Sequence, residues 1–298
     1  MKKTSAWDKA VKHAADPARA KHFLELLRGT ESKSDLTLVT VDQARILCSL
    51  FSGSQALSTA LVAHPEWLKL LDPDRLKFPR RKEGLAAELE SEVEASLSTN
   101  SYSQGLKSVR EFKNRELLRI AARDLSRLAD VVEITGELSS LADVVLDAVF
   151  RLCLQQLEER VGRPYHRDAS GRWRPTLSCV LGMGKLGGRE LNYSSDVDVL
   201  FVYSDEGSVF KQSPQERKAL KPSLANHQFF TRLAESFVTE VTRSAPEGSL
   251  YRIDVRLRPE GDAGPLSRSV SGYENYYAQW GQTWERMMLI KARRVAGH

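Results

Sequence analysis

Little in the sequence marks a membrane or secreted protein. No stretch approaches the roughly eighteen consecutive apolar residues that a membrane helix needs. The N-terminal segment carries charges throughout and lacks the apolar core of a secretory signal. The cysteines, Cys48, Cys153 and Cys179, lie far apart, are odd in number and show no Cys-x-x-Cys spacing, which argues against a disulfide framework or a zinc site. We therefore expect a cytoplasmic protein with reduced, mostly buried thiols and no contact with a membrane.

The sequence also has only a small excess of positive over negative charge. Lysine and arginine total 44 against 39 aspartate and glutamate residues, so the formal net charge is +5 over 298 residues. Such a small excess suits an anionic ligand but does not indicate nucleic-acid binding. No basic tract with interleaved aromatic residues appears, as a groove for single-stranded nucleic acid would require. We expect no nucleic-acid partner.

The spacing of apolar residues changes along the chain. In the first half they recur mostly at helical spacing, and Leu117–Leu128 and Leu138–Leu157 are predicted as long amphipathic helices. The segment YHRDASGRWRP that follows is rich in turn formers and is predicted to be a linker. We predict an α+β fold, with a helical region over residues 1–157 and a core over residues 164–298 that contains a small mixed sheet flanked by helices.

Strand patterns appear only in the second region. TLSCVLGMG predicts a short buried strand, and Asp196–Ser204 and Leu250–Arg258 alternate apolar and polar residues as half-buried strands do. Between the last two, Leu224–Ala245 predicts a long helix. The chain is expected to close with a helical stretch over about Val270–Val295.

Three carboxylates belong to the polar faces of these strands. Asp196 and Asp198 are two residues apart and therefore project to the same side, while Val197 and Val199 project into the core. Asp254 occupies the polar face of the later strand, so the three carboxylates could converge. An isolated Asp-x-Asp pair is frequent in solvated loops, but three hard oxygen ligands suit Mg²⁺, with Mn²⁺ as an alternative.

Glycines precede the aspartate pair. In GMGKLGGREL they stand at positions 182, 184, 187 and 188, between the buried strand and a short helix. Backbone N–H groups of such a turn could line a phosphate, although turns also use glycine for its conformational freedom. The order of buried strand, glycine turn, Asp-x-Asp strand and later aspartate strand is more specific than any one of these features.

These motifs carry a family resemblance. GMGKLGGRELNYSSDVDVLFVYSDEG and YRIDVRLRPEGDAGPLSRSVSGYENYYAQWGQTWERMMLIKARRVAGH resemble the DNA polymerase β-like nucleotidyltransferase superfamily and, within it, the glutamine synthetase adenylyltransferase family. The helical segment FSGSQALSTALVAHPEWLKLL is similar to that family as well. The resemblance covers roughly residues 40–298 and implies a polymerase β-like core.

The resemblance also implies an activity. Family members carry two nucleotidyltransferase copies: one removes AMP from a tyrosine of glutamine synthetase by phosphorolysis, giving ADP, and the other adds AMP from ATP. This sequence resembles the N-terminal, AMP-removing copy, and family members continue beyond His298, so we expect a truncated gene or a fragment. Glutamine synthetase, ATP or ADP, inorganic phosphate and the PII signal protein are the implied partners.

Residue roles follow from the chemistry and the resemblance together. Two metal ions would align the in-line attack at phosphorus. Asp196 and Asp198 are expected to bind both of these ions, and Asp254 is expected to hold the catalytic one. The expected nucleotide- and phosphate-binding residues are Gly184, Lys185, Gly187, Gly188, Ser195, Arg256 and Arg258. Other interpretations remain open for these residues: the two arginines could simply pair with the acids, the lysine could be solvated, and the serine could cap a turn.

Two alternatives to this function remain. The chain could be another polymerase β-like nucleotidyltransferase, such as an RNA-end polymerase or a small-molecule adenylyltransferase. It could also be a catalytically incomplete fragment that only binds nucleotide or glutamine synthetase.

Two further patterns have structural interpretations. Arginines recur every four residues at positions 115, 119, 123 and 127, which favours a solvated helix face partnered by Glu111 and Asp124 over a docking stripe. Trp280 and Trp284 stand at helical spacing, which favours core packing over a nucleotide-stacking platform.

Overall fold

The chain divides into two compact units, which are described separately. The computed structural model describes residues 6–31, 36, 39–97, 101–214 and 220–298. The first unit comprises Met1–Arg80 and Asn114–Leu138, and the second comprises Arg81–Lys113 and Ser139–His298. Two long helices, α6 (Tyr102–Leu125) and α7 (Val131–Val161), contribute residues to both units. The domain boundary between residues 157 and 164 stays a prediction.

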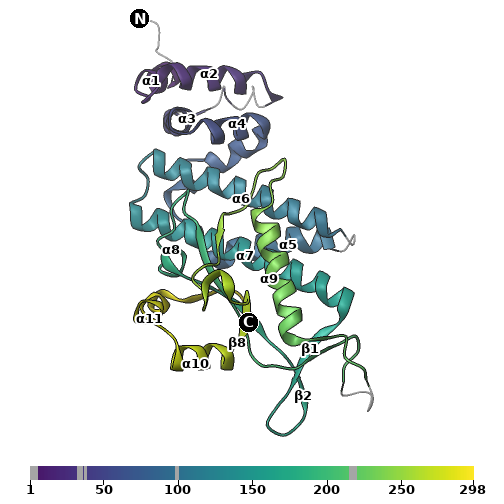
Figure 1. Ribbon diagram of the computed structural model, residues 1–298. Helices are drawn as coiled ribbons and strands as arrows, with labels where there is room; N and C mark the ends of the chain where they lie inside the picture. Colours follow the sequence, from purple (N-terminus) through teal and green to yellow (C-terminus); the bar gives the residue numbers. More distant parts are fainter. Residues whose placement is uncertain (1–5, 32–35, 37–38, 98–100, 215–219) are drawn as a thin grey trace, which may run out of the picture. The chain divides into compact units, whose positions relative to one another are not determined.

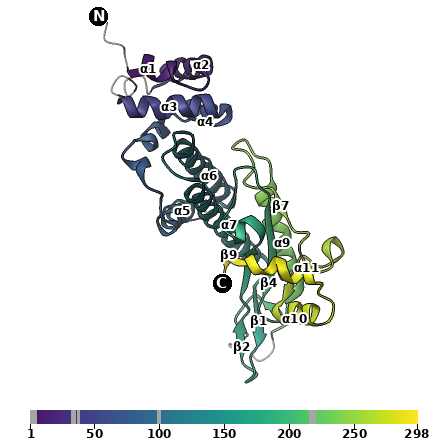
Figure 2. The ribbon, with the colours of Figure 1, turned by 90° about the vertical axis from the view of Figure 1, so that its left-hand side faces the viewer.

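The N-terminal part of the first unit is helical, as predicted. Its elements are α1 (Ala6–Lys12), α2 (Pro17–Arg28), α3 (Val41–Gly53), α4 (Gln55–Ala63) and the 3₁₀ helices η3 (Pro65–Leu71) and η4 (Arg75–Lys77). Local sequence explains several helix starts, because the side chains of Asp16, Thr40 and Ser54 each accept a hydrogen bond from a backbone N–H in the first turn of α2, α3 and α4. Helices α1 and α2 lie against α3 and α4 (Figures 1 and 2). Their buried side chains, among them Leu27, Leu50 and Phe51, form one hydrophobic core.

The second unit combines helices with two small sheets. Its remaining helices are α5 (Lys82–Leu97), α8 (Gly184–Gly187), α9 (Asn226–Thr242), α10 (Val270–Gln279), α11 (Thr283–Met288) and the 3₁₀ helices η5 (Gly261–Ala263) and η6 (Leu289–Lys291). Its strands are β1 (Arg163–Arg167), β2 (Trp173–Pro175), β3 (Ser178–Gly182), β4 (Val197–Tyr203), β5 (Ser208–Phe210), β6 (Leu224–Ala225), β7 (Ile253–Asp254), β8 (Ser267–Ser269) and β9 (Arg293–Gly297). The predicted α+β fold with a small mixed sheet is confirmed. No helix in the described part of the chain is both long and apolar enough to cross a membrane.

Strand β4 is the centre of the larger sheet. It pairs antiparallel with β3, and β7 and then β8 pair with its other edge in parallel, while β9 pairs antiparallel with β3. Helix α9 packs against β4 through aromatic rings: Phe237 lies 5.5 Å from Phe201, and Phe230 lies 4.6 Å from Tyr203, both between ring centroids. Both strands that were predicted around the glycine turn, β3 and β4, are confirmed.

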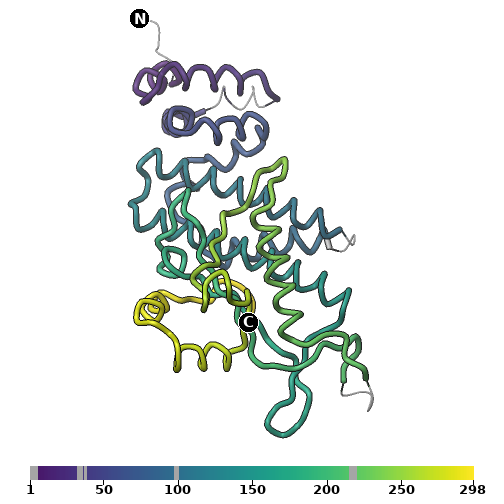
Figure 3. The backbone as a smooth tube through the Cα atoms, viewed as in Figure 1, coloured from purple at the N-terminus to yellow at the C-terminus, as the bar shows by residue number. Residues whose placement is uncertain are grey.

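The predicted linker is wrong, because it forms a hairpin. Strands β1 and β2 pair antiparallel with Arg167 opposite Trp173, and β1 also pairs with β5 in a second sheet. The Asp168 carboxylate accepts hydrogen bonds from the N–H groups of Ser170 and Arg172 and so closes the turn. In Figures 1 and 3 the hairpin extends away from the rest of the second unit.

Three predictions for the C-terminal part are also wrong. The strand that was expected over Leu250–Arg258 ends at Asp254, because the chain then turns: Arg258 N–H bonds Val255 O, and Pro259 removes the next donor. The expected helix ends at Lys291, and Arg293–Gly297 form strand β9 instead. Trp280 and Trp284 are 70% and 59% exposed, so core packing was the wrong interpretation of their spacing.

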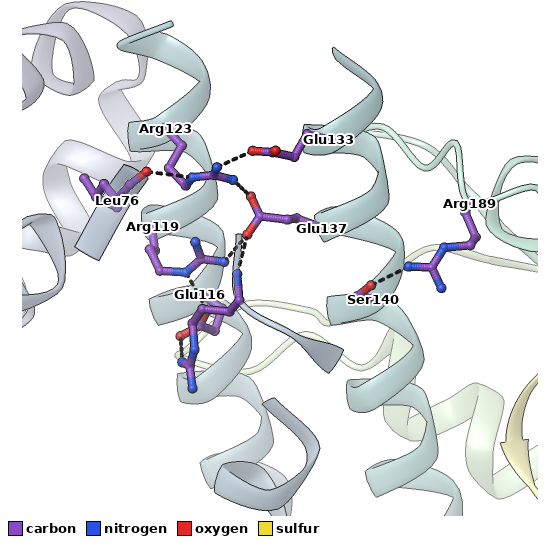
Figure 4. A network of polar contacts seen from close by, with 9 residues as sticks. Leu76, Glu116, Arg119, Arg123, Glu133, Glu137, Ser140 and Arg189 are labelled. Carbon is purple, nitrogen blue, oxygen red and sulfur yellow. Dashed lines mark hydrogen bonds and ion pairs between the residues drawn. The ribbon is translucent and has the colours of Figure 1, made fainter. Parts of the chain in front are cut away.

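The arginine series on α6 is neither a solvated face nor a docking stripe. Arg123 is fully buried and Arg119 is 4% exposed, whereas Arg127 lies beyond the end of the helix. Arg119 donates to Glu116 Oε2 at 2.8 Å and to Glu137 Oε1 at 2.6 Å, as Figure 4 shows. Helical spacing identified a shared face, but the structure buries the middle of that face beneath η4 and α7.

Arg123 completes this network within the first unit. Its guanidinium donates to Leu76 O at 2.9 Å and to the carboxylates of Glu133 and Glu137 (Figure 4). Buried charges are costly unless each has partners, so every member depends on the others. The network therefore fixes how α6, α7 and η4 pack.

We expect Glu137→Gln to destabilise the protein by about 3 kcal/mol, because it leaves two buried guanidinium groups short of a counter-charge. Glu111→Gln on α6 is the matched control, since Glu111 is partly exposed and pairs with Lys107 at 3.6 Å. The free energy of unfolding of Glu111→Gln should fall by less than about 1 kcal/mol. Urea unfolding measures both free energies. Equal losses for the two variants would contradict a stabilising role of the network.

Candidate active site

The glycine turn is positioned by strand pairing. Gly182 at the end of β3 lies opposite Val199 of β4, and the next residue, Met183, donates its N–H to Asp198 O at 2.8 Å. The chain then forms the single helical turn α8 and passes through Gly188. The predicted glycine turn therefore begins directly beside Asp198.

Two of the glycines allow close approach. Gly184 has φ +51°, and a Cβ atom there would lie 2.6 Å from Asp198 Oδ2. At Gly187 a Cβ atom would lie 2.0 Å from Lys291 O, a distance that no side chain tolerates. Glycine is required at both positions for these reasons. The turn is held against the Asp198 carboxylate on one side and against backbone from the C-terminal segment on the other.

The three predicted aspartates come from adjacent strands. Asp198 and Asp254 are directly paired residues of the parallel strands β4 and β7, so their side chains project to the same face of the sheet. Asp196 immediately precedes β4, where Val197 N–H bonds Arg252 O at 2.9 Å. Val197 and Val199 are fully buried, as the alternation predicted. The strands therefore bring Asp198 and Asp254 together, with Asp196 beside them.

Arginines neutralise two of these carboxylates. Arg252 Nε donates to Asp196 Oδ1 at 2.6 Å, and this pair is largely exposed. Arg256 donates to Asp254 through its backbone N–H at 2.8 Å and through its guanidinium at 2.5 and 3.1 Å. Among the residues that the structure describes, no group of three His, Cys, Asp or Glu side chains is already arranged to hold a metal ion. The donor set suits a hard cation, which would have to compete with these arginines.

The carboxyl groups differ in electrostatic environment. Burial raises the pKa of Asp198 above its ordinary value, and the neighbouring charges of Asp254 and Asp196 raise it further. Hydrogen bonds from Arg256 lower the pKa of Asp254. The Asp198 carboxylate is thus repelled by its two neighbouring carboxylates, and a cation at this site would relieve that repulsion.

The other predicted site residues lie in three different settings. Lys185 is exposed on α8, and its charge lowers the pKa of Asp198. Ser195 is half-buried, and its backbone N–H closes a turn to Asn192 O. Arg258 is 8% exposed and donates to Gly264 O and Val255 O, so it does not share a strand face with Asp254 as predicted. The structure brings Lys185 and Arg256 to the carboxylates but uses Arg258 to hold a loop.

Arg252 is a site residue that the sequence analysis missed. Besides its pair with Asp196, it donates to Ser194 O at 2.7 Å. The available signal was its place two residues before Asp254, which puts both on one face of a strand. Arg252 therefore adds a cationic side chain beside the carboxylates.

Asp198→Asn should remove metal binding without harming the fold. Because the folded-state pKa of Asp198 is raised, its charge costs stability, and this cost appears as the pH rises above the ordinary value of 3.8. At pH 7 with a chelator, we therefore expect the variant to melt at or above the parent's Tm. Addition of Mn²⁺ and ADP should raise the parent's Tm and not that of the variant.

Asp205→Asn is the matched control for this experiment. Asp205 follows the opposite end of β4, where its carboxylate lies 3.5 Å from the His166 ring. This control should keep the metal-dependent rise in Tm. A rise of parental size in Asp198→Asn would place the metal elsewhere.

Sequence comparisons place these features in a known family. A family model described as glutamate-ammonia ligase adenylyltransferase matches residues 44–298. A relative from Thioalkalivibrio sulfidiphilus, named bifunctional glutamine synthetase adenylyltransferase/adenylyl-removing enzyme, is 39% identical over 84% of this chain and 24% of its own length. Relatives with the same name from Shewanella loihica and Nitrosococcus oceani are 32% and 34% identical, over 97% and 92% of this chain and 28% and 27% of their own lengths.

The chain thus spans about a quarter of the length of the curated relatives it matches. Adenylyl transfer is a nucleotidyl transfer, and enzymes of this kind in general use a divalent metal ion. The matched residues contain the glycine turn and all three aspartates. The chain belongs to the glutamate-ammonia ligase adenylyltransferase family.

Proposed function

We propose that this chain is a nucleotidyltransferase that removes AMP from the adenylylated tyrosine of glutamine synthetase. One observation carries the proposal: Asp198 and Asp254 lie side by side on paired strands, on one face of the sheet, with the glycine turn against Asp198. Carboxylates beside a glycine turn with free backbone approach are the parts that transfer of a nucleotidyl group needs. The names of the relatives support the identity of the protein substrate.

The proposed reaction is phosphorolysis. An oxygen of inorganic phosphate forms a bond to the AMP phosphorus, the bond from that phosphorus to the tyrosine oxygen breaks, and the tyrosine oxygen takes a proton. The products are ADP and free tyrosine. Two anions must approach each other, so cationic groups are needed around the attacking phosphate.

The chain's own residues would meet these requirements. Asp196, Asp198 and Asp254 would hold Mg²⁺, or Mn²⁺, which when bound neutralises charge at phosphorus and orients the phosphate groups. Lys185 and Arg256 would contact phosphate oxygens, with the backbone of Gly184, Gly187, Gly188 and Ser195 shaping the subsite. Arg252 and Arg256 are exposed enough to leave their carboxylates. Arg258 would act by holding the loop after Asp254, given its two backbone acceptors.

Control of the reaction belongs to the same proposal. The PII signal protein and ATP are the further partners that family membership suggests. Their contacts would be made by the whole protein, of which this chain resembles the N-terminal, AMP-removing copy.

A non-catalytic function is the second candidate. The specific observation in its favour is that arginines already occupy Asp196 and Asp254, leaving no preformed metal site among the described side chains. Under this alternative the chain would bind nucleotide or glutamine synthetase without turnover. The third candidate is a polymerase β-like nucleotidyltransferase that acts on a different substrate. That substrate would bind in the same site in place of glutamine synthetase.

We expect release of ADP when the protein is incubated with adenylylated glutamine synthetase, Mg²⁺ and phosphate. Asp254→Asn should lower the rate by at least about a hundredfold, because the lost charge acts on the transition state. Asp262→Asn is the matched control, since this aspartate is 80% exposed in the loop after β7. Chromatography of the released nucleotide measures the rates of all three proteins.

A full-length relative from the same family serves as the positive control for the substrate. Release of AMP instead of ADP would mean hydrolysis and would overturn phosphorolysis. Modification of the synthetase with ATP would assign the opposite direction. Binding of ADP with no turnover, beside an active relative, would establish the non-catalytic alternative for this chain.

A further inference from the structure

A buried ion cluster lies behind the glycine turn. Asp143 of α7 is fully buried, and its carboxylate accepts from Arg293 Nη1 and Nη2 at 2.6 and 2.9 Å. Lys82 Nζ of α5 donates to the same carboxylate at 2.7 Å. All three residues belong to the second unit. A buried carboxylate with two cationic partners fixes their positions strongly, because losing either partner leaves charge uncompensated.

The same guanidinium also holds the turn itself. Arg293 Nη2 donates to Leu186 O at 2.9 Å, and its Nε donates to Gly187 O at 3.3 Å. These are the last two residues of α8, whose carbonyl groups lack partners within the helix, although Leu186 O also accepts from Arg189 N–H at 3.1 Å. Four of the five N–H bonds of the guanidinium are thus used, two on Asp143 and two on the turn.

Neighbouring contacts restrict the turn further. Lys291 Nζ pairs with Glu190 at 3.0 Å, and the backbone of Lys291 fills the space that a side chain at position 187 would need. From α7, Ser140 Oγ accepts from Arg189 at 2.9 Å, as Figure 4 shows, and Ser139 Oγ accepts from Leu191 N–H at 3.1 Å. The far side of the turn is left to face Asp198.

We propose that Asp143 and Arg293 are positioning residues for the phosphate-binding turn. They fix the carbonyl end of α8, and thereby place Gly184 and Lys185 against Asp198. This inference rests on the proposed function, since it names what sets the geometry of that same site. Neither residue lies among the carboxylates or the candidate phosphate contacts.

The planar fork of arginine explains why this residue suits the position. A bidentate pair with a carboxylate and two carbonyl contacts from one side chain require donors in a fixed plane. Lysine at position 293 would keep the charge and the pair with Asp143 but would reach fewer acceptors. Arg293→Lys therefore separates orientation of the turn from simple burial of charge.

The test compares Arg293→Lys with Arg294→Lys. Arg294 is the next residue of β9, is exposed, and donates to Gly297 O. In Arg293→Lys we expect the amide NMR signals of Gly184, Gly187 and Gly188 to shift. The KM for phosphate should rise by on the order of tenfold to a hundredfold, with the Tm lowered by only a few degrees. Arg294→Lys should match the parent in every measurement.

Asp143→Asn provides a second variant that should shift the same glycine signals. A merely structural role would lower Tm while leaving both these signals and the KM of the folded protein unchanged, and that result would overturn the proposal. The NMR readout needs no turnover. If the parent protein releases no ADP, the proposed function fails, and shifted glycine signals in Arg293→Lys alone still support the positioning role; unshifted signals reject it.

Discussion

The candidate site depends on the pairing of β4 with a different strand on each edge. Antiparallel β3 delivers the glycine turn to Asp198 through the Met183 N–H bond, and parallel β7 delivers Asp254 to its other side. A shift of either pairing by one residue would turn the side chains to the opposite face of the sheet. The aromatic packing of α9 on β4 opposes such a shift, because Phe201 and Tyr203 are seated against Phe237 and Phe230.

Charge at this site is balanced unequally. Asp196 and Asp254 each have an arginine partner, whereas Asp198 lies half-buried beside two other carboxylates, and its pKa is raised. The Arg252–Asp196 pair is exposed and contributes little stability, so it can be exchanged for a metal ion and a phosphate at small cost. The proposed function uses this exchange, because the cations that neutralise the carboxylates without substrate would be the ones that contact phosphate.

Sequence reasoning predicted the parts of the site that depend on local periodicity. Alternation in β4 placed Asp196 and Asp198 opposite two buried valines, and the glycine turn was found from composition. It failed where segments distant in the sequence determine the environment of a residue. Helical spacing identified the face that carries Arg119 and Arg123, but nothing near them in the sequence showed that this face would be buried and paired with Glu137. Arg258 was misplaced because a strand pattern continued through residues that a turn interrupts. Domain limits and residue roles remain predictions.

Two buried ionic clusters use desolvated charge differently. In the first unit, Arg119 and Arg123 bond mainly to carboxylates, so that cluster determines how helices pack. In the second, Arg293 divides its donors between Asp143 and two backbone carbonyl groups. The Asp143 carboxylate on α7 therefore orients the glycine turn through Arg293. Apolar residues could replace the first kind of contact with little loss of stability. They could not replace the second, because an apolar side chain at position 293 would remove the donor from Gly187 O, and the position of the turn beside Asp198 depends on that contact.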